Sequence, residues 1–354
     1  MTGRQAARKS VAHLGELLDG LVSEERSESG VPRMDLPHCT ELSLPRPAAG
    51  RRFRVRAGPD GVHLFDRTSG LNVLLDELPF NPRLWAEAPR QVSIALTNAC
   101  DLGCSHCFAP KHPAVLAPDR VVGWLAELDV SGCLGVGFGG GEPTLYRQLL
   151  DLCRYATHET GLAVTFTTHA HHLDGALLGS LAGNVNFVRV SMDGVGTTYE
   201  ALRGRPFERL RQRLREIRDF VPFGINCVVN SATLPDLDAA AMIAADFGAR
   251  EFLLLPEQPV HGQGGIDAAT SGELQRWVRR YRGPVPLTVS EAGADGLPTC
   301  DPLPAEKGLR AYAHIDASGV LRPSSFAADG VAIGADGLMH ALGRLRTLQI
   351  QERQ

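Results

Sequence analysis

Residues 97–108 read Thr97-Asn-Ala-Cys100-Asp-Leu-Gly-Cys104-Ser-His-Cys107-Phe108, and they directly follow a strand-like apolar run at residues 92–96. The stretch places three cysteines within eight residues in a CxxxCxxC spacing. Thiols this close together in a loop indicate a metal site. Iron–sulfur and structural zinc sites usually take four protein ligands, and no fourth cysteine lies nearby. The stretch therefore predicts a metal held by Cys100, Cys104 and Cys107 with one position left open.

Alternating strand-like and helix-like segments begin at this stretch. We expect strands near residues 92–97, 133–138, 162–168, 186–192, 223–230 and 250–256. We expect helices near residues 119–130, 146–160, 174–182, 198–220, 235–247 and 271–282. Six βα units in succession predict an α/β fold with a parallel sheet, curved or closed, and helices on its outside. Functional groups in such folds gather at the carboxyl ends of the strands.

The remaining segments predict four regions. Residues 1–50 hold a short amphipathic helix at 4–23 and a linker, and residues 51–90 predict small β-hairpins. The βα units occupy residues 91–283, and residues 284–354 form a Pro- and Gly-rich region with a hairpin at 314–323 and a final helix near 336–350.

Composition narrows the function classes. The 354 residues are 44% hydrophobic and 21% charged with a net charge of −4, which gives no electrostatic reason to expect a nucleic acid or an anionic membrane as partner. No run of about 18 apolar residues predicts a membrane span, and acidic residues interrupt any signal peptide. Three clustered and five scattered cysteines do not form a disulfide framework, so we expect a cytoplasmic protein.

Further motifs at the strand ends give the chain a resemblance to radical S-adenosylmethionine (SAM) enzymes over residues 91–260. Gly140-Gly141-Glu142-Pro143 follows the second strand and is similar to the GGEP motif of that family. Ser191-Met-Asp193-Gly194 ends the fourth strand. The resemblance implies a partial (β/α)6 barrel. His106 stands where family members usually carry an aromatic residue, and Thr168-His169-Ala170 stands where they often have Thr-Asn-Gly.

The resemblance also implies cofactors and their ligands. Three thiolates would hold a [4Fe–4S] cluster whose open iron binds SAM, and reductive cleavage of SAM would yield a 5′-deoxyadenosyl radical that abstracts a substrate hydrogen. An electron donor such as a flavodoxin or ferredoxin is implied as well. The residues that would contact SAM are Gly140, Gly141, Glu142, Thr168, Ser191, Asp193, Asn226 and Val228.

The C-terminal region is similar to the SPASM or twitch extension of one subgroup, as is the segment Tyr199-Glu-Ala-Leu-Arg203-Gly204. Cys300 would match a cysteine of that extension, but Pro323 is followed by two serines where another cysteine would be expected. One thiol cannot hold an auxiliary cluster. We therefore expect a degenerate twitch-like cap at residues 284–354 and a single cluster in the chain. A thiol in such a cap has one alternative use, as a hydrogen-atom donor to a substrate radical.

Each motif has a simpler alternative. The cysteines are also compatible with a Cys3His zinc site completed by His106 or His112. His169, His171 and His172 favour a hydrogen-bonded turn over a second metal site. The arginines of residues 203–218 favour a solvated helix face. Three residues at the expected barrel rim, Glu257, His261 and Lys111, are candidates for proton transfer or substrate binding by position alone.

The leading hypothesis is an enzyme whose reaction, whether oxidation, isomerisation or bond formation, the sequence does not specify. Its substrate would be a ribosomally made peptide undergoing maturation or, alternatively, a small metabolite of natural-product biosynthesis. Residues 1–90 show no clear winged-helix peptide-recognition domain. A rival hypothesis from another class is a non-catalytic, metal-stabilised binding subunit.

Overall fold

The computed structural model describes residues 53–77, 81–259 and 264–352, all of which belong to one compact unit. The helix and linker predicted within residues 1–50 and the candidate His261 lie outside the described residues. The boundaries predicted between the hairpin region, the barrel and the cap stay predictions.

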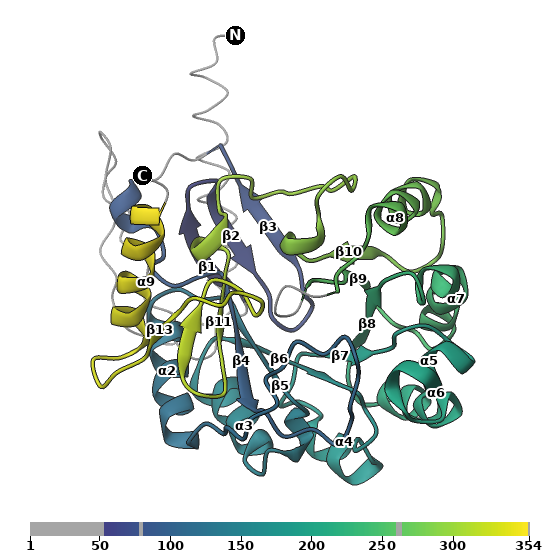
Figure 1. The fold of residues 1–354 in the computed structure, drawn as a ribbon. Coiled ribbons are helices and arrows are strands. Elements are labelled where there is room, and N and C mark those ends of the chain that lie inside the picture. The colour runs from purple at the N-terminus through teal and green to yellow at the C-terminus, as the bar shows by residue number, and fades with distance from the viewer. Residues whose placement is uncertain (1–52, 78–80, 260–263, 353–354) are drawn as a thin grey trace, which may run out of the picture. The chain divides into compact units, whose positions relative to one another are not determined.

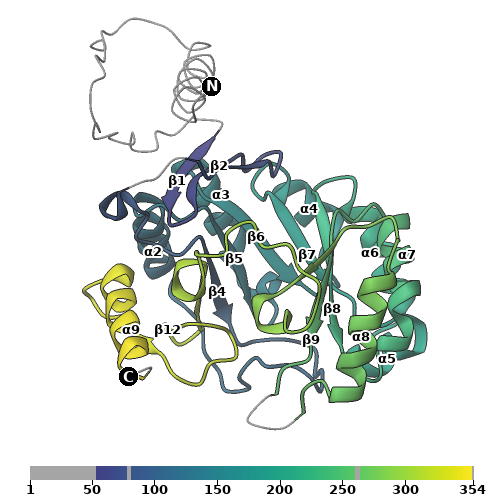
Figure 2. The same cartoon turned by 90° about the horizontal axis from the view of Figure 1, so that it is seen from above.

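Six parallel strands in consecutive order form the centre of the structure, which confirms the partial (β/α)6 barrel (Figure 1). These strands are β4 (Gln91–Thr97), β5 (Gly135–Gly140), β6 (Ala163–Thr168), β7 (Phe187–Ser191), β8 (Phe223–Val229) and β9 (Phe252–Pro256). The helices that follow them are α2 (Pro118–Val130), α3 (Leu149–Glu159), α4 (Gly175–Leu181), α5 (Gly196–Arg203), α6 (Phe207–Ile217), α7 (Leu237–Asp246) and α8 (Ala268–Arg280). Figure 2 shows them along the outer face of the curved sheet. None of the described helices combines the length and apolar composition that a bilayer crossing needs.

The two faces of the sheet have different chemistry. On β4, Val92, Ile94 and Leu96 are fully buried in the hydrophobic core that the sheet shares with the helices. Because side chains alternate along a strand, Gln91, Ser93 and Ala95 face the opposite side, the barrel interior. The same alternation on β5 turns Gly135, Gly137 and Gly139 inward. A Cβ atom added to Gly139 would meet no atom within 4 Å, so the interior is open at this strand end.

The single helix expected over residues 198–220 is wrong, because the chain forms two helices there. Helix α5 ends at Arg203 and is capped by Gly204, whose φ of 64° is the left-handed conformation that glycine adopts without steric cost. Pro206 then precedes α6 and has no N–H group to continue the helical hydrogen-bond pattern. The break frees the end of α5 to turn toward the carboxyl ends of the strands.

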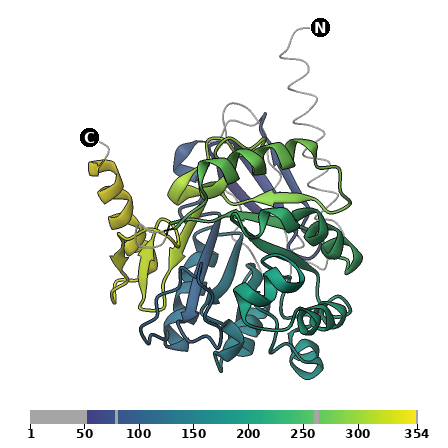
Figure 3. The ribbon, with the colours of Figure 1, turned by 45° about the vertical axis from the view of Figure 1, so that its right-hand side comes forward.

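The C-terminal region extends both edges of the main sheet. Strand β10 (Leu287–Val289) pairs in parallel with β9 at one edge. The predicted hairpin is present as β11 (Tyr312–Ile315) and β12 (Val320–Arg322), and β13 (Val331–Ala332) pairs with β12. Strand β11 also pairs in parallel with β4 at the other edge, which the sequence analysis did not anticipate. The last described helix, α9 (Leu338–Glu352), lies beside this hairpin (Figure 3).

The predicted hairpins before the barrel form a three-stranded antiparallel sheet of β1 (Arg54–Gly58), β2 (Gly61–Phe65) and β3 (Asn72–Leu75). Arginines attach this sheet to the barrel. Arg54 pairs with Asp129 at 2.5 Å, and Arg67 donates to the carbonyl of Thr157 in the last turn of α3 and to those of Thr160 and Leu162 after it. Arg56 is buried and forms a salt bridge with Glu306, which is also buried.

Replacing Arg56 by alanine is expected to lower the free energy of unfolding by about 3–5 kcal/mol, because it leaves the Glu306 carboxylate buried with Arg90, at 3.4 Å, as its one remaining charged partner among the described residues. Denaturant unfolding checks this, with the exposed Arg83→Ala as control and an expected cost within about 0.5 kcal/mol. The double variant Arg56→Met/Glu306→Met should recover most of the loss. A single-variant cost below about 1 kcal/mol would contradict the prediction.

Candidate metal and cofactor site

The cysteine loop follows β4, and it presents free thiols close to one another. Cys104 is buried, Cys107 is half-buried and Cys100 is exposed, and none of them forms a disulfide. The Cys107 amide donates to the Cys104 carbonyl at 3.2 Å, and the Leu102 amide donates to the Cys100 sulfur at 3.4 Å. The loop therefore already carries an N–H group directed at a sulfur, as occurs around iron–sulfur clusters.

Three of the other four described cysteines do not offer a fourth ligand of this kind, and the remaining one, Cys300, is exposed in the C-terminal region. Cys133, Cys153 and Cys227 are fully buried in the core. Burial raises the pKa of the Cys133 thiol to about 11 and that of Cys153 to about 12, and it raises the pKa of Cys227 as well. Because a metal ligand must be a thiolate, these groups behave as small apolar side chains.

The GGEP loop after β5 packs directly against the start of the cysteine loop. The Gly141 amide donates to the Thr97 carbonyl at 2.6 Å, and the Glu142 amide donates to the Ala99 carbonyl at 2.8 Å. A Cβ atom on Gly140 would lie 2.2 Å from the Thr97 oxygen, and one on Gly141 would lie 2.1 Å from the Ala99 oxygen. Only glycine allows this approach. The two glycines therefore set the position of the cysteine loop, whatever they contact in SAM.

Glu142 connects the GGEP loop to the end of β6. Its side chain is 1% exposed, and Oε1 accepts hydrogen bonds from Thr144 Oγ1 and Thr168 Oγ1, both at 2.6 Å. The backbone amides of Thr144 and His169 donate to the same carboxylate, at 3.1 and 2.9 Å. Four donors thus hold this carboxylate in one place, and Thr168, a predicted cofactor contact, is one of them.

His169 connects the end of β6 back to the cysteine loop. The His171 amide donates to Nδ1 of His169, so the proton of the neutral ring is on Nε2. That atom lies 2.9 Å from Asp101 Oδ1 and 3.3 Å from Glu142 Oε2. Burial opposes ionisation of Asp101, but hydrogen bonds from His169, His172 and Arg205 hold the pKa of its carboxyl far below its usual range. The histidines therefore form the hydrogen-bonded turn that their sequence favoured.

A cation could be considered at this turn, since Cys100, Asp101 and His169 place ligand atoms within 4.8 Å of one another. However, Asp101 and His169 already hydrogen-bond each other, and Cys100 belongs to the cysteine loop. These three residues therefore belong to the site around the cysteine loop and do not form a separate cation site.

Asp193, at the end of β7, is fully buried and is bound by protein groups on both oxygens. Oδ1 accepts from the Val228 amide at 2.8 Å, and Oδ2 lies 2.8 Å from His106 Nε2. Arg203 binds Oδ2 as well, at 2.5 Å. His106, the considered zinc ligand, is thus directed at Asp193 through Nε2. The prediction of a solvated arginine face is wrong for Arg203, whose side chain is only 12% exposed.

The remaining predicted SAM contacts lie at the neighbouring strand ends. Ser191 and Val228 are half-buried, and Asn226 is buried on the inner face of β8. Among the residues that the structure describes, Asn226 Oδ1 has no hydrogen-bond partner. A buried acceptor without a partner is costly unless a ligand supplies a donor. Free thiols, donors directed at sulfur and this acceptor all fit a cluster with SAM beside it.

Ala170, directly after His169, has a φ of 66° and is fully buried. This left-handed conformation is strained for residues with a Cβ atom and most strained for β-branched ones. Ala170→Val is therefore expected to lower the free energy of unfolding by about 2–4 kcal/mol. Ala170→Gly should stay within about 1 kcal/mol of wild type, because relief of strain offsets the lost methyl contact and the greater flexibility of the unfolded chain. Chemical denaturation measures both, and equal costs would contradict the prediction.

A polar cluster on the inner face of the sheet was not predicted from the sequence. Ser93 Oγ on β4 lies 2.5 Å from Tyr312 Oη and 2.7 Å from His314 Nδ1, both on β11. Tyr312 and His314 alternate with Ala313 and Ile315, which belong to the hydrophobic core, so they face the barrel interior. Only the pairing of β11 with β4 brings the three together, and no local sequence pattern signals it.

Burial lowers the pKa of His314 to about 4, despite the nearby Asp316 carboxylate, while Arg322 also disfavours the charged ring. The unfolded chain therefore binds a proton between pH 6.5 and 4 that the folded chain does not, so stability falls as pH falls through this window. His314→Gln removes this contribution. When the pH is lowered from 7.5 to 4.5, the wild type should therefore lose about 2–3 kcal/mol more of its free energy of unfolding than His314→Gln loses. A pH-independent difference in denaturant titrations would contradict this.

Two of the residues proposed from the sequence for proton transfer or substrate binding lie within the described part of the chain. Glu257, directly after β9, accepts a hydrogen bond from Asn230 Nδ2 at 2.8 Å and is half-buried at the same strand-end rim. Lys111 is exposed on the loop between the cysteines and α2. Their roles stay predictions, as does that of His261.

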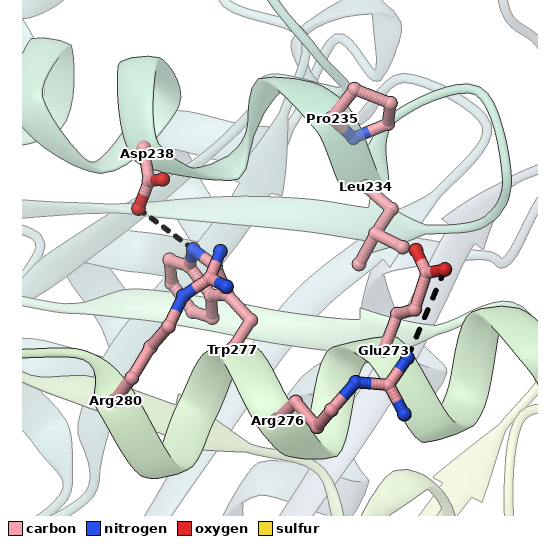
Figure 4. A pocket seen from close by; sticks show the side chains of 7 residues that line it. All are labelled: Leu234, Pro235, Asp238, Glu273, Arg276, Trp277 and Arg280. Carbon is pink, nitrogen blue, oxygen red and sulfur yellow. Dashed lines mark hydrogen bonds and ion pairs between the residues drawn. The ribbon is translucent and has the colours of Figure 1, made fainter.

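Two surface cavities lie away from the strand ends. One of about 360 Å³ lies between α7 and α8, where Trp277 donates to Asp238 and Arg276 pairs with Glu273 (Figure 4). The other, of about 460 Å³, lies between α2 and residues 333–337. Neither is lined by a residue of the site described above.

Comparison with known proteins agrees with this geometry. Residues 94–244 match the Radical SAM superfamily. The chain is 31% identical over 182 residues to the AdoMet-dependent heme synthase of Methanosarcina barkeri, covering 48% of this chain and 52% of that protein. It is 30% identical over 172 residues to the mycofactocin maturase MftC of Mycolicibacterium smegmatis, covering 46% and 43%.

The fold also resembles the crystal structure of Streptococcus suis SuiB bound to the precursor peptide SuiA. The TM-score is 0.60 at 14% identity, covering 77% of this chain and 82% of SuiB. The chain spans about half the length of the curated relatives it matches. Residues 94–244 are a radical SAM domain.

Proposed function

We propose that this radical SAM domain holds one [4Fe–4S] cluster on Cys100, Cys104 and Cys107 together with SAM, and that the chain is a radical SAM enzyme. When bound, these groups supply a reductive cleavage that produces a 5′-deoxyadenosyl radical able to remove hydrogen from an unreactive carbon. The proposal rests on the junction between the three-cysteine loop and the GGEP loop. There, amides of the GGEP loop donate hydrogen bonds to the carbonyls of Thr97 and Ala99. This junction supports the proposal because it holds the loop that carries three free thiols against the GGEP loop, at the carboxyl ends of β4 and β5.

The chain's own residues would bind and orient SAM around this junction. Asn226 Oδ1 is a buried acceptor that needs a donor, and Ser191 lies on the neighbouring strand. Gly140, Gly141, Thr168 and Val228 would line SAM at the same rim, and three of them also hold the surrounding loops through their hydrogen bonds to Thr97, Glu142 and Asp193. Glu142 and Asp193 are already bound by protein donors, so their contribution is to hold the loops that surround SAM. The curved sheet would keep the radical away from water.

The substrate would enter the barrel interior and meet the wall formed by Ser93, Tyr312 and His314. These side chains offer hydroxyl and imidazole groups that suit a polar substrate such as a peptide amide. We favour a ribosomally made peptide, because one relative is named a maturase and the neighbouring fold was solved with a precursor peptide. A small metabolite is the second candidate, because another relative is named a heme synthase. Glu257, His261 and Lys111 remain proposed substrate residues at the rim.

The test is anaerobic reconstitution with iron and sulfide followed by dithionite and SAM. The enzyme is expected to form 5′-deoxyadenosine, and a deuterated substrate should transfer deuterium into it. A protein that binds metal but yields no 5′-deoxyadenosine under any condition would instead support the non-catalytic binding subunit. About four irons per chain agree with a degenerate cap that has lost its metal, whereas eight or more would contradict it.

We also infer a reducing compartment such as the cytoplasm, because the described cysteines are free thiols and an oxygen-sensitive cluster requires it. A small electron-transfer protein such as a flavodoxin or ferredoxin would supply the electron.

A further inference from the structure

Arg203 is placed at the cysteine loop by the break between α5 and α6. It is the last residue of α5, one helical turn after Tyr199, so both side chains lie on the same face of the helix. Tyr199 is fully buried, with its hydroxyl 3.0 Å from His171 Nε2, and this fixes the helix against the histidine turn. Arg203 then extends toward the cysteine loop.

The guanidinium of Arg203 joins a strand end to a cysteine sulfur. Nη2 lies 2.5 Å from Asp193 Oδ2, and Nη1 donates to Cys104 Sγ at 3.6 Å. Asp193 is itself fixed by the Val228 amide on β8. Because the guanidinium is planar and rigid, binding Asp193 through one nitrogen orients the other toward the sulfur. The Cys104 contact is therefore a consequence of the buried ion pair.

We infer that Arg203 is a positioning residue that raises the reduction potential of the cluster by donating a hydrogen bond to the Cys104 sulfur. The inference rests on the proposed function and deepens it. One-electron reduction adds negative charge to the cluster, and a cation and a hydrogen bond at a ligand sulfur stabilise that charge. Asp193 binds Nη2, the other nitrogen of the guanidinium, and leaves Nη1 to donate to the sulfur.

A purely structural role for Arg203, as the counterion of a buried carboxylate, predicts a different result. In that case, removing the arginine changes stability or cluster retention but leaves the potential of any assembled cluster unchanged. Under our inference, removal of the Arg203 guanidinium deletes the hydrogen bond to Cys104 and also takes the arginine counterion from Asp193, whose described partners are then His106 and the Val228 amide. Both changes lower the reduction potential of the cluster, so the two effects add.

The experiment is an EPR-monitored redox titration of the reconstituted protein, with and without SAM. Arg203→Gln is expected to assemble the cluster with a more negative midpoint potential than wild type. Arg203→Lys keeps the charge but cannot span Asp193 and Cys104 together, so its potential should lie between the two. The matched control is Arg211→Gln, at an arginine of α6 whose side chain is 40% exposed and pairs with Glu208.

The outcomes separate the two proposals. Equal midpoint potentials in wild type, Arg203→Gln and Arg203→Lys would overturn the inference, as would an equal shift in Arg211→Gln. If Arg203→Gln does not fold, Arg203→Lys decides, and a wild-type potential in that variant overturns the inference. A wild-type protein that assembles no cluster at all would overturn the proposed function itself.

Discussion

Replacing Cys100, Cys104 or Cys107 by alanine, one at a time, is expected to reduce 5′-deoxyadenosine formation by at least about a thousandfold, because the cofactor carries chemistry that no side chain can replace. The three substitutions should differ in their effect on the stability of the protein. Cys104 is buried and its sulfur accepts a hydrogen bond from Arg203, whereas Cys100 is exposed. Loss of the Cys104 thiol should therefore also lower the thermal stability of the apoprotein, and loss of Cys100 should not.

Cys300→Ala is the matched control, since Cys300 is an exposed free cysteine outside the cysteine loop. It should retain wild-type iron content, visible absorbance and SAM cleavage. Full iron content in any of the three single loop variants would contradict the assignment of the ligands. A loss of product with unchanged SAM cleavage in Cys300→Ala would instead support Cys300 as a hydrogen-atom donor.

Replacing Glu142 by alanine is expected to lower the free energy of unfolding by about 3–5 kcal/mol, because four donors lose their acceptor in a buried position. SAM binding should be lost with it, since the same carboxylate connects the GGEP loop to the end of β6. Denaturant unfolding and equilibrium SAM binding to the reconstituted protein measure the two effects separately.

Glu142→Gln tests whether the acceptor or the charge matters. The amide keeps the shape and one acceptor oxygen, so its cost should be about 1–2 kcal/mol. The exposed Glu159→Ala at the end of α3 should change stability by no more than about 0.5 kcal/mol. If Glu142→Ala unfolds at the same denaturant concentration as Glu159→Ala, the hydrogen-bond network does not stabilise the site.

Features specified by local sequence could be predicted, and the strands of the barrel are the main example. Apolar runs, glycine motifs and their order along the chain place the cysteine loop, the GGEP loop and Asp193 at one rim. The hydrogen-bonded character of the histidine turn was also predicted. The hydrogen bonds that connect these loops could not be predicted, because the contacts of Glu142, His169 and Asp101 join residues from different strand ends.

Features that depend on pairing between distant segments could not be predicted. Arg203 is one of seven arginines in residues 203–218, and only the helix break at Gly204 and Pro206 separates it from the exposed ones. The inner wall of Ser93, Tyr312 and His314 depends on β11 pairing with β4, which no periodicity in either segment indicates.

The pairing of β11 with β4 has a consequence for how the protein is made. Strand β4 leads into the cysteine loop, yet its outer neighbour is synthesised more than two hundred residues later. Contacts so far apart in the chain form slowly, and a ribosome delivers the N-terminal partner first. During synthesis, the strand that precedes the three loop cysteines therefore has an unpaired edge. Shortening the chain before residue 312 would leave that edge permanently exposed, and we expect such a chain to aggregate before the proposed cluster could be inserted.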